Sequence, residues 1–202
     1  KSIELCAKLR SNNRLDWDNI LVNLEYVPLE YTNSRIDLMA QWSQDFNKGS
    51  LDTSLVLFYE EKPCGIWPLN ININGQEILQ SNGSAILKPL FIRGLSKKIE
   101  KKLLEKCILF IEKTIKKYDG CRWSVSEIYN SSRGISKWYE LLTLKGLILE
   151  KNSYILILDL TMSIDEIWSS FRKSYRPLIN KGLKLWDVKV VSHQDDLVWY
   201  DF

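Results

Sequence analysis

Basic side chains gather in one short stretch near the C-terminal end of the chain. The strongest candidates for binding a substrate are Arg172, Lys173, Arg176 and Lys181. Arg172 and Arg176 are four positions apart, so on one helix they would share a face and could grip a phosphate or carboxylate group at two points. The alternative is a solvated helix face with Asp165 and Glu166 as neighbours. We predict that the four cations bind a charged substrate.

A single carboxylate is the candidate proton acceptor. Glu127 stands at the end of a predicted strand over 122–128. An amine that attacks a thioester must lose a proton near neutral pH, and a carboxylate at this place could take it. The alternative is an ordinary surface residue. The only histidine, His193, falls in a polar stretch expected to be an exposed loop. The sequence alone therefore identifies no complete catalytic constellation.

The cysteines do not form a recognisable metal or redox motif. They are Cys6, Cys64, Cys107 and Cys121, and no pair has the short C-x-x-C spacing. With one histidine in the chain, we expect no zinc site. Cys107 and Cys121 fit small core residues. Unpaired thiols favour a reducing compartment, so we expect the protein in the cytoplasm.

Composition limits the class of protein. The chain has 202 residues, of which 45% are hydrophobic and 26% charged. These values are ordinary for a globular domain and exclude a disordered or fibrous chain. No apolar run is long enough to predict a transmembrane segment. The net charge of +3 is too small to indicate nucleic-acid binding by itself, and no DNA partner is expected.

The longest helix signal, over 96–118, is strongly basic. It carries eight lysines and three glutamates outside an apolar stripe that includes Leu103, Cys107 and Ile111. We interpret the lysines as a solvated face with Glu–Lys pairs. The alternative is a phosphate-binding face, which would make the protein an RNA binder.

The remaining patterns predict helices and strands in a mixed order. Helices are expected over 17–24, 34–46 and 136–144, and strands over 54–59, 64–71, 77–80, 86–92, 122–128 and 154–160. The proline inside 86–92 indicates an edge, a bulge or an irregular ladder. This order predicts an α+β fold, with a mixed, mostly antiparallel sheet flanked by helices on both faces.

Two segments carry a family resemblance. Residues 130–147 resemble the Asn, Tyr, Leu and Gly pattern of GNAT acyltransferases. Residues 163–190, with an acidic-capped helix, a basic Arg-Lys-Ser-x-Arg helix and a glycine, resemble the start of the second GNAT-like domain in FemAB-type proteins. Shorter pieces at 65–69, 81–83 and 89–92 resemble the branch that is encoded with surface-polysaccharide genes.

The resemblance implies a double GNAT-like architecture. Residues 1–152 would form the first domain, and 153–202 would begin a second, truncated one. The loop 93–98 has an arginine and a glycine but not the spacing of the phosphate-binding loop of acyl-CoA-dependent GNAT domains, so we do not predict a CoA site in the first domain. The apolar run 197–202 and the missing initiator methionine indicate an N-terminal fragment of a longer protein.

The function implied by the resemblance is acyl transfer. The full-length protein would move an acyl or aminoacyl group from acyl-CoA or aminoacyl-tRNA, with no tightly bound cofactor, to a cell-envelope or surface-polysaccharide precursor such as a nucleotide sugar. We expect the donor site in the part of the second domain that these 202 residues do not include. The alternative is a non-catalytic, degenerate GNAT-like domain that binds a glycan precursor or a partner protein. Trp67 is expected in the core, or alternatively in a cleft for a sugar ring.

Overall fold

The computed structural model describes residues 5–24, 26–45, 49–72, 78–117, 123–127, 136–148 and 161–186. The chain divides into two units, Lys1–Leu149 and Glu150–Phe202. The sequence pattern placed this division between residues 152 and 153. The predicted strand over 154–160, Cys121 and His193 all lie outside the described residues.

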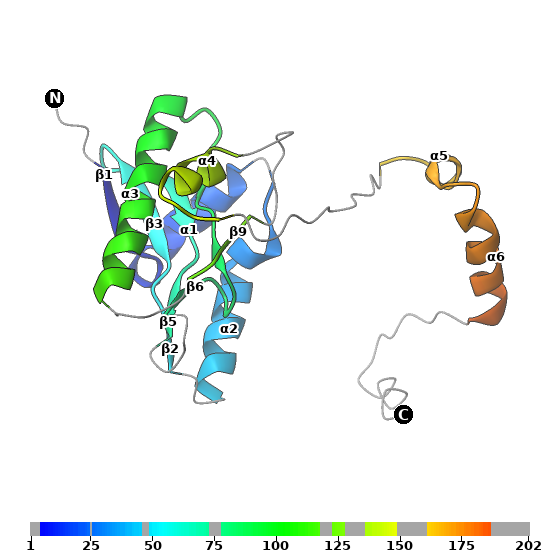
Figure 1. Ribbon diagram of the computed structural model, residues 1–202, viewed down its shortest axis with the longest axis horizontal. Helices are drawn as coiled ribbons and strands as arrows, with labels where there is room; N and C mark the ends of the chain where they lie inside the picture. The colour runs from blue at the N-terminus through cyan, green and yellow to red at the C-terminus, as the bar shows by residue number, and fades with distance from the viewer. Residues whose placement is uncertain are drawn as a thin grey trace. The chain divides into compact units, whose positions relative to one another are not determined.

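The first unit contains both helices and short strands (Figure 1), so the predicted α+β class is confirmed. Its α-helices are α1 (Arg14–Val22), α2 (Asn33–Asp45), α3 (Lys97–Lys117) and α4 (Lys137–Leu144), with 3-10 turns η1 (Arg10–Asn12) and η2 (Leu29–Tyr31). Its strands are β1 (Leu5–Leu9), β2 (Ser50–Asp52), β3 (Leu55–Tyr59), β4 (Lys62–Trp67), β5 (Asn70–Asn72), β6 (Leu79–Gln80), β7 (Ile86–Leu87), β8 (Leu90–Phe91) and β9 (Val125–Ser126).

The strands form three small sheets among the described residues. The largest has the order β1-β3-β4-β8 and is antiparallel throughout. A second antiparallel sheet has the order β2-β5-β6. The third is the parallel pair β7-β9, joined along the chain by α3. Parallel strands need such a crossover, and a helix is the usual one.

Alternation along β3 divides the core between the two faces of the largest sheet. Leu57 packs into a cluster with Leu104 of α3 and Trp138 of α4. Val56 and Phe58 point the other way and join a cluster that includes residues of α1. Because side chains alternate across a strand, this pattern requires helices on both faces.

Two predicted strands are each divided in the structure. The expected strand 64–71 becomes β4 and β5, which belong to different sheets. The expected strand 86–92 becomes β7 and β8, which pair with β9 and β4 respectively. Pro68 and Pro89 stand at the two interruptions. Proline has no N–H to donate to a ladder, so each one ends the pairing where it stands.

The basic helix α3 follows its predicted pattern closely. Its apolar stripe is buried, and Cys107 is 4% exposed. The three glutamates of the helix all pair with lysines, two within α3 and one with Lys145 beyond α4. Lys106 donates to the backbone carbonyl oxygen of Leu5 at 3.0 Å. These contacts match a solvated, ion-paired outer face.

The described part of the second unit consists of α5 (Ile164–Ser170) and α6 (Tyr175–Leu185). Ser163 begins α5 with a capping box, in which its hydroxyl accepts from the backbone N–H of Glu166 and the Glu166 side chain accepts from the backbone N–H of Ser163. The predicted acidic cap is therefore present.

Over the described residues, no helix is both long and apolar enough to cross a membrane.

Candidate functional site

The four predicted cations do not share one helix face. Arg172 and Lys173 lie, exposed, in the connection between α5 and α6, whereas Arg176 is the second residue of α6. The prediction that Arg172 and Arg176 share a helix is wrong, because α5 ends before Phe171 and α6 begins after Ser174.

Arg176 has a contact of its own. Its Nη2 donates to the backbone carbonyl oxygen of Ser169 at 2.8 Å, and so satisfies one of the free carbonyls at the end of α5. Lys181 is exposed on α6, about 140° around the helix from Arg176 at roughly 100° per residue. Arg172 and Arg176 are thus not arranged to bind one phosphate or carboxylate together, as their spacing had suggested. Substrate binding by the four cations stays a prediction.

Pro177 is the third residue of α6, where its missing N–H costs no intrahelical hydrogen bond. Its ring would clash with the carbonyl group of Lys173 if the helix continued upstream, which fits the break between α5 and α6. None of the described residues in α5 or α6 is buried.

Glu127 lies at the carboxyl end of the parallel strand pair, and it is buried. In the register of that pair Leu87 lies beside Ser126, so Lys88 and Glu127 are the residues that directly follow the two strands. The Lys88 ammonium forms a short ion pair with Glu127 Oε1. The Glu127 side chain is only 2% exposed, against 23% for Lys88. The alternative that Glu127 is a surface residue is therefore wrong.

Two tyrosines surround this ion pair. The Tyr31 hydroxyl donates to the backbone carbonyl oxygen of Lys88 at 2.5 Å. Burial raises the pKa of Tyr31 far above its ordinary value, and the charge of Glu127 adds to the effect. Burial and Glu127 also raise the pKa of Tyr139, although a hydrogen bond with the backbone of Glu127 opposes them. Both phenols are thus neutral hydrogen-bonding groups near pH 7.

Lys88 also forms part of the wall of a cavity of about 380 Å³. The cavity reaches the loop that leads into α3 and the start of α4, and its charged lining residues are Lys88, Arg93, Lys97, Lys137 and Glu100. Three of the four cations are ion-paired, Lys88 with Glu127, Lys97 with Glu100 and Lys137 with Glu140, so the wall keeps only a small positive excess for an anionic group. The loop in this wall, 93–98, was not predicted to bind CoA, because its spacing differs from that of the phosphate-binding loop.

Two buried polar atoms at this place have no hydrogen-bond partner among the described residues. They are Glu127 Oε2, an acceptor, and Trp138 Nε1, a donor. Trp138 is fully buried and lines the cavity beside Lys88. Buried polar groups are almost always satisfied, so unpaired ones beside a cavity mark a place where water or a ligand completes the bonding. We call Lys88, Glu127, Trp138 and Tyr139 the ion-pair site.

Sequence reasoning found Glu127 but missed its partners. Lys88 is a lone cation inside the apolar run 86–92, and that was the available signal. Trp67, by contrast, is 1% exposed and donates to the backbone carbonyl oxygen of Leu87 at 2.7 Å. The core interpretation of Trp67 is confirmed, and the cleft alternative is wrong.

The described residues contain no group of three His, Cys, Asp or Glu side chains placed to hold a metal ion. Comparison of the chain with protein-family models, curated proteins and solved structures finds no match. The resemblance to FemAB-type proteins therefore stays a prediction that rests on the motifs themselves.

Proposed function

We propose that the protein is an acyltransferase that acts on a cell-envelope or surface-polysaccharide precursor in the cytoplasm. The observation that carries the proposal is the ion-pair site: a buried carboxylate with a free oxygen, at the carboxyl end of a parallel strand pair, beside a cationic cavity. Amine acylation needs a proton acceptor and an environment that stabilises the oxyanion, and this site has groups for both.

The chemistry assigns one task to each side chain. The acceptor nitrogen attacks the acyl carbonyl carbon of a thioester or ester, and the carbonyl oxygen becomes negatively charged. The Lys88 ammonium and the Trp138 indole N–H are the donors that would stabilise that oxygen. The nitrogen then loses a proton to Glu127, either directly or through an intervening water, and the thiolate or alkoxide leaves.

The cationic wall is suited to the phosphate groups of the co-substrate. Acyl-CoA and nucleotide sugars both carry a diphosphate, and aminoacyl-tRNA carries a phosphate backbone. The lining cations Arg93, Lys97 and Lys137 would contact such a group beside Lys88. As a separate part of the proposal, Arg172, Lys173, Arg176 and Lys181 of the second unit bind a charged group of the substrate.

The alternative function is a non-catalytic domain that binds a glycan precursor or a protein partner. One contact favours it: Lys88 already occupies one oxygen of Glu127, as it would in a purely structural ion pair. Under this alternative the cavity binds its ligand without chemical change.

The test uses the whole chain with acyl-CoA donors and amino-sugar nucleotides, and detects released CoA with a thiol reagent. Glu127→Gln should abolish release while leaving the donor-dependent rise in melting temperature. The matched control, Glu112→Gln, removes an ion pair with Lys145 outside the cavity and should have no effect.

Two results would contradict catalysis. One is stabilisation by nucleotide sugars with no release from any donor, which would establish the binding domain. The other is release that persists in Glu127→Gln, which would exclude Glu127 as the proton acceptor.

A further inference from the structure

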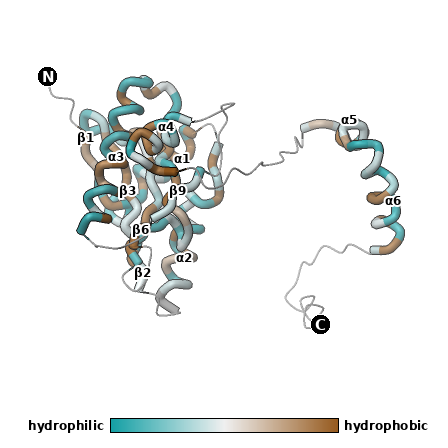
Figure 2. Tube along the Cα trace, in the orientation of Figure 1, coloured by the Kyte–Doolittle hydropathy of each residue, from teal (hydrophilic) through white to brown (hydrophobic). Residues whose placement is uncertain are grey.

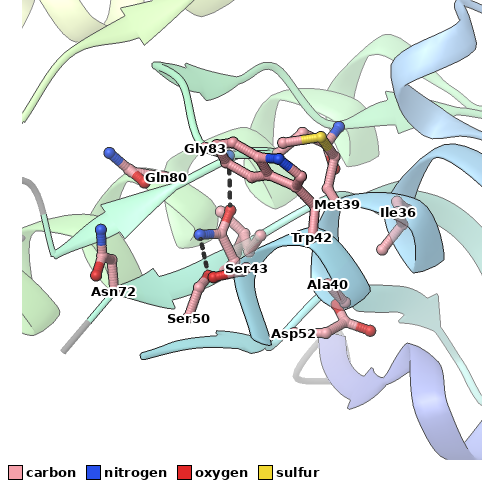
Figure 3. Close-up of a pocket in the computed structure, with 13 residues that line it drawn as sticks. Ile36, Met39, Ala40, Trp42, Ser43, Ser50, Asp52, Asn72, Gln80 and Gly83 are labelled. Atoms are coloured by element: carbon pink, nitrogen blue, oxygen red, sulfur yellow. Dashed lines mark hydrogen bonds between the residues drawn. The ribbon is translucent and has the colours of Figure 1, made fainter. Parts of the chain in front are cut away.

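A second pocket lies between α2 and the small sheet β2-β5-β6 (Figure 3). It has a volume of about 180 Å³, room for roughly six water molecules at about 30 Å³ each. Helix α2 forms one wall, and the strands with the turn at Asn82 and Gly83 form the other. It is too small for a nucleotide but large enough for one small ring.

The polar groups in this pocket are neutral. Its lining includes four amides and two hydroxyls, from Asn70, Asn72, Gln80, Asn82, Ser43 and Ser50. The lining carboxylate, Asp52, is ion-paired with Arg10 at 2.7 Å. Among the lining residues there is no lysine or arginine to attract a phosphate. An ionic ligand would thus find no free opposite charge.

Amides match the chemistry of a sugar. Each amide carries both a donor and an acceptor, and so does each sugar hydroxyl. Asn70 is already oriented: its Nδ2 donates to Ser50 Oγ at 2.8 Å, and its Oδ1 accepts from the backbone N–H of Gly83 at 3.4 Å (Figure 3). Asn82 Nδ2 likewise donates to the backbone carbonyl oxygen of Glu30 at 2.8 Å. A ring with several hydroxyls would therefore bond to the second N–H and the second lone pair that such amides keep.

The helix side of the pocket supplies an aromatic surface. Figure 3 shows Trp42 and Met39 extending from α2 across from the strand residues Gln80 and Asn72. Trp42 is 40% exposed, although tryptophan is usually well buried. An indole has a flat apolar face, against which the C–H face of a sugar ring can pack, and a polar N–H edge.

One buried hydroxyl in the pocket wall has no partner. Ser43 is 5% exposed, and its Oγ has no hydrogen-bond partner among the described residues. An unsatisfied buried hydroxyl destabilises the unliganded fold. The Oγ atom itself is closed to solvent, so a ligand hydroxyl would complete the bond after the Ser43 side chain turns toward the pocket.

From these observations we propose that the α2 pocket binds an uncharged sugar ring. As a binding site it stands on its own geometry. Its role as the site for the glycan part of the acceptor rests on the proposed acyltransferase function. The segment from Gly83 to Lys88 joins the pocket wall directly to the ion-pair site.

The test measures binding of glucose, galactose and N-acetylglucosamine to the whole chain by saturation-transfer NMR, with no acyl donor present. Inorganic phosphate, which has no carbon-bound protons to detect, is added as the charged competitor. We expect saturable binding of at least one sugar, and no loss of its signal when phosphate is added. Trp42→Ala should weaken binding roughly three- to tenfold. Leu38→Ala, an exposed apolar position on the same helix, should leave it unchanged.

Ser43→Ala separates a ligand role from a structural one. We expect it to weaken sugar binding while keeping or raising the melting temperature, because it removes an unsatisfied buried hydroxyl. Absence of saturable binding by all three sugars would overturn the proposal. So would sugar binding that Trp42→Ala and Ser43→Ala leave unchanged.

The experiments test the sugar site and the acyltransferase function independently of each other. Sugar binding that depends on Trp42, without CoA release, would support the sugar site and contradict the acyltransferase proposal. CoA release that depends on Glu127, with no sugar binding at Trp42, would do the reverse.

Discussion

Arg10 shows how one buried cation ties together distant parts of the first unit. It is 3% exposed, and its guanidinium donates to Asn33, Asp37 and Asp52. Asp37 also accepts from Arg14. A buried charge is tolerated only when it is paired and hydrogen-bonded, and here three side chains share that task. The network joins η1, α2 and β2, and it fixes Asp52 beside the α2 pocket.

Asp37 should make the stability of the first unit sensitive to acid. Burial acts to raise the pKa of Asp37, but hydrogen bonds from Arg10 and Arg14 outweigh it and lower the pKa below its ordinary value. A lowered folded-state pKa means that the contribution is complete above about pH 4, the unfolded value, and is lost as pH falls through the folded pKa.

We therefore expect the free energy of unfolding to fall below about pH 4, and Asp37→Asn to reduce that slope. At pH 7 the variant should lose about 1 kcal/mol or less, because Asp37 is half exposed. Urea denaturation between pH 3 and 7 measures both effects. Glu105→Gln, in an exposed ion pair, is the control. An unchanged slope in Asp37→Asn would show that Asp37 is not the titrating group.

For individual residues, the sequence predicted part of the candidate site. Glu127 could be singled out by its place after a strand, but its burial could not, because that depends on Lys88, Tyr31 and α4 meeting around it. Apart from the short piece 81–83, the α2 pocket left no sequence motif. Its polar side chains come from α2, three strands and a turn, and only tertiary packing brings them together.

Elements were predicted well where one periodic pattern was long. Helix α3 shows this, since it was expected over 96–118 and spans Lys97–Lys117, with Leu103, Cys107 and Ile111 of its predicted stripe buried. Phe110 of that stripe is 38% exposed, whereas Leu104 and Ile108 beside it are buried. Short strands were harder. β1 was missed because its side chains are mostly exposed and leave little alternation. Helix α1 was expected over 17–24, yet it spans Arg14–Val22 with Asn13 at the N-cap position.

At Gly65, strands β4 and β8 of the largest sheet approach each other closely. A Cβ at this position would lie 2.6 Å from Phe91 Cδ1 and 2.9 Å from the backbone oxygen of Leu90. The ring could move, but the backbone oxygen belongs to the β4-β8 ladder and cannot move without disturbing it. Only glycine permits this approach.

We therefore expect Gly65→Ala to cost about 1–3 kcal/mol, as overpacking does, and to lower the melting temperature by several degrees. Gly182→Ala is the matched control in α6, where the nearest atom to the new Cβ is a Trp186 ring carbon at 3.5 Å. It should keep the melting temperature and raise helicity, because alanine favours a helix interior over glycine. Equal melting temperatures for Gly65→Ala and the parent would contradict this prediction, because β8 would then shift to make room for the Cβ without loss of stability.

Over the whole molecule, the two units differ in how their helices are stabilised. Helix α3 buries Leu103, Leu104 and Ile111 in a core built with the sheets. Helix α6 buries no described residue, and Leu183 and Trp186 are among its exposed apolar side chains. Figure 2 shows hydrophobic and hydrophilic residues interleaved along α6. An amphipathic helix of eleven residues is only marginally stable without a partner for its apolar face.

Hydrogen exchange should therefore separate the two helices. Amides of α3 are expected to exchange only on global unfolding, over hours or longer, because their opening exposes the core. Amides of α6 should exchange within minutes, because opening them exposes no buried surface. Mass spectrometry of peptides covering 97–117 and 164–185 measures both, at two protein concentrations. Protection of α6 as strong as that of α3, at both protein concentrations, would contradict the prediction, since the apolar face of α6 would then be covered within the same chain. Protection of α6 that grows with concentration would instead show that a second copy covers this face.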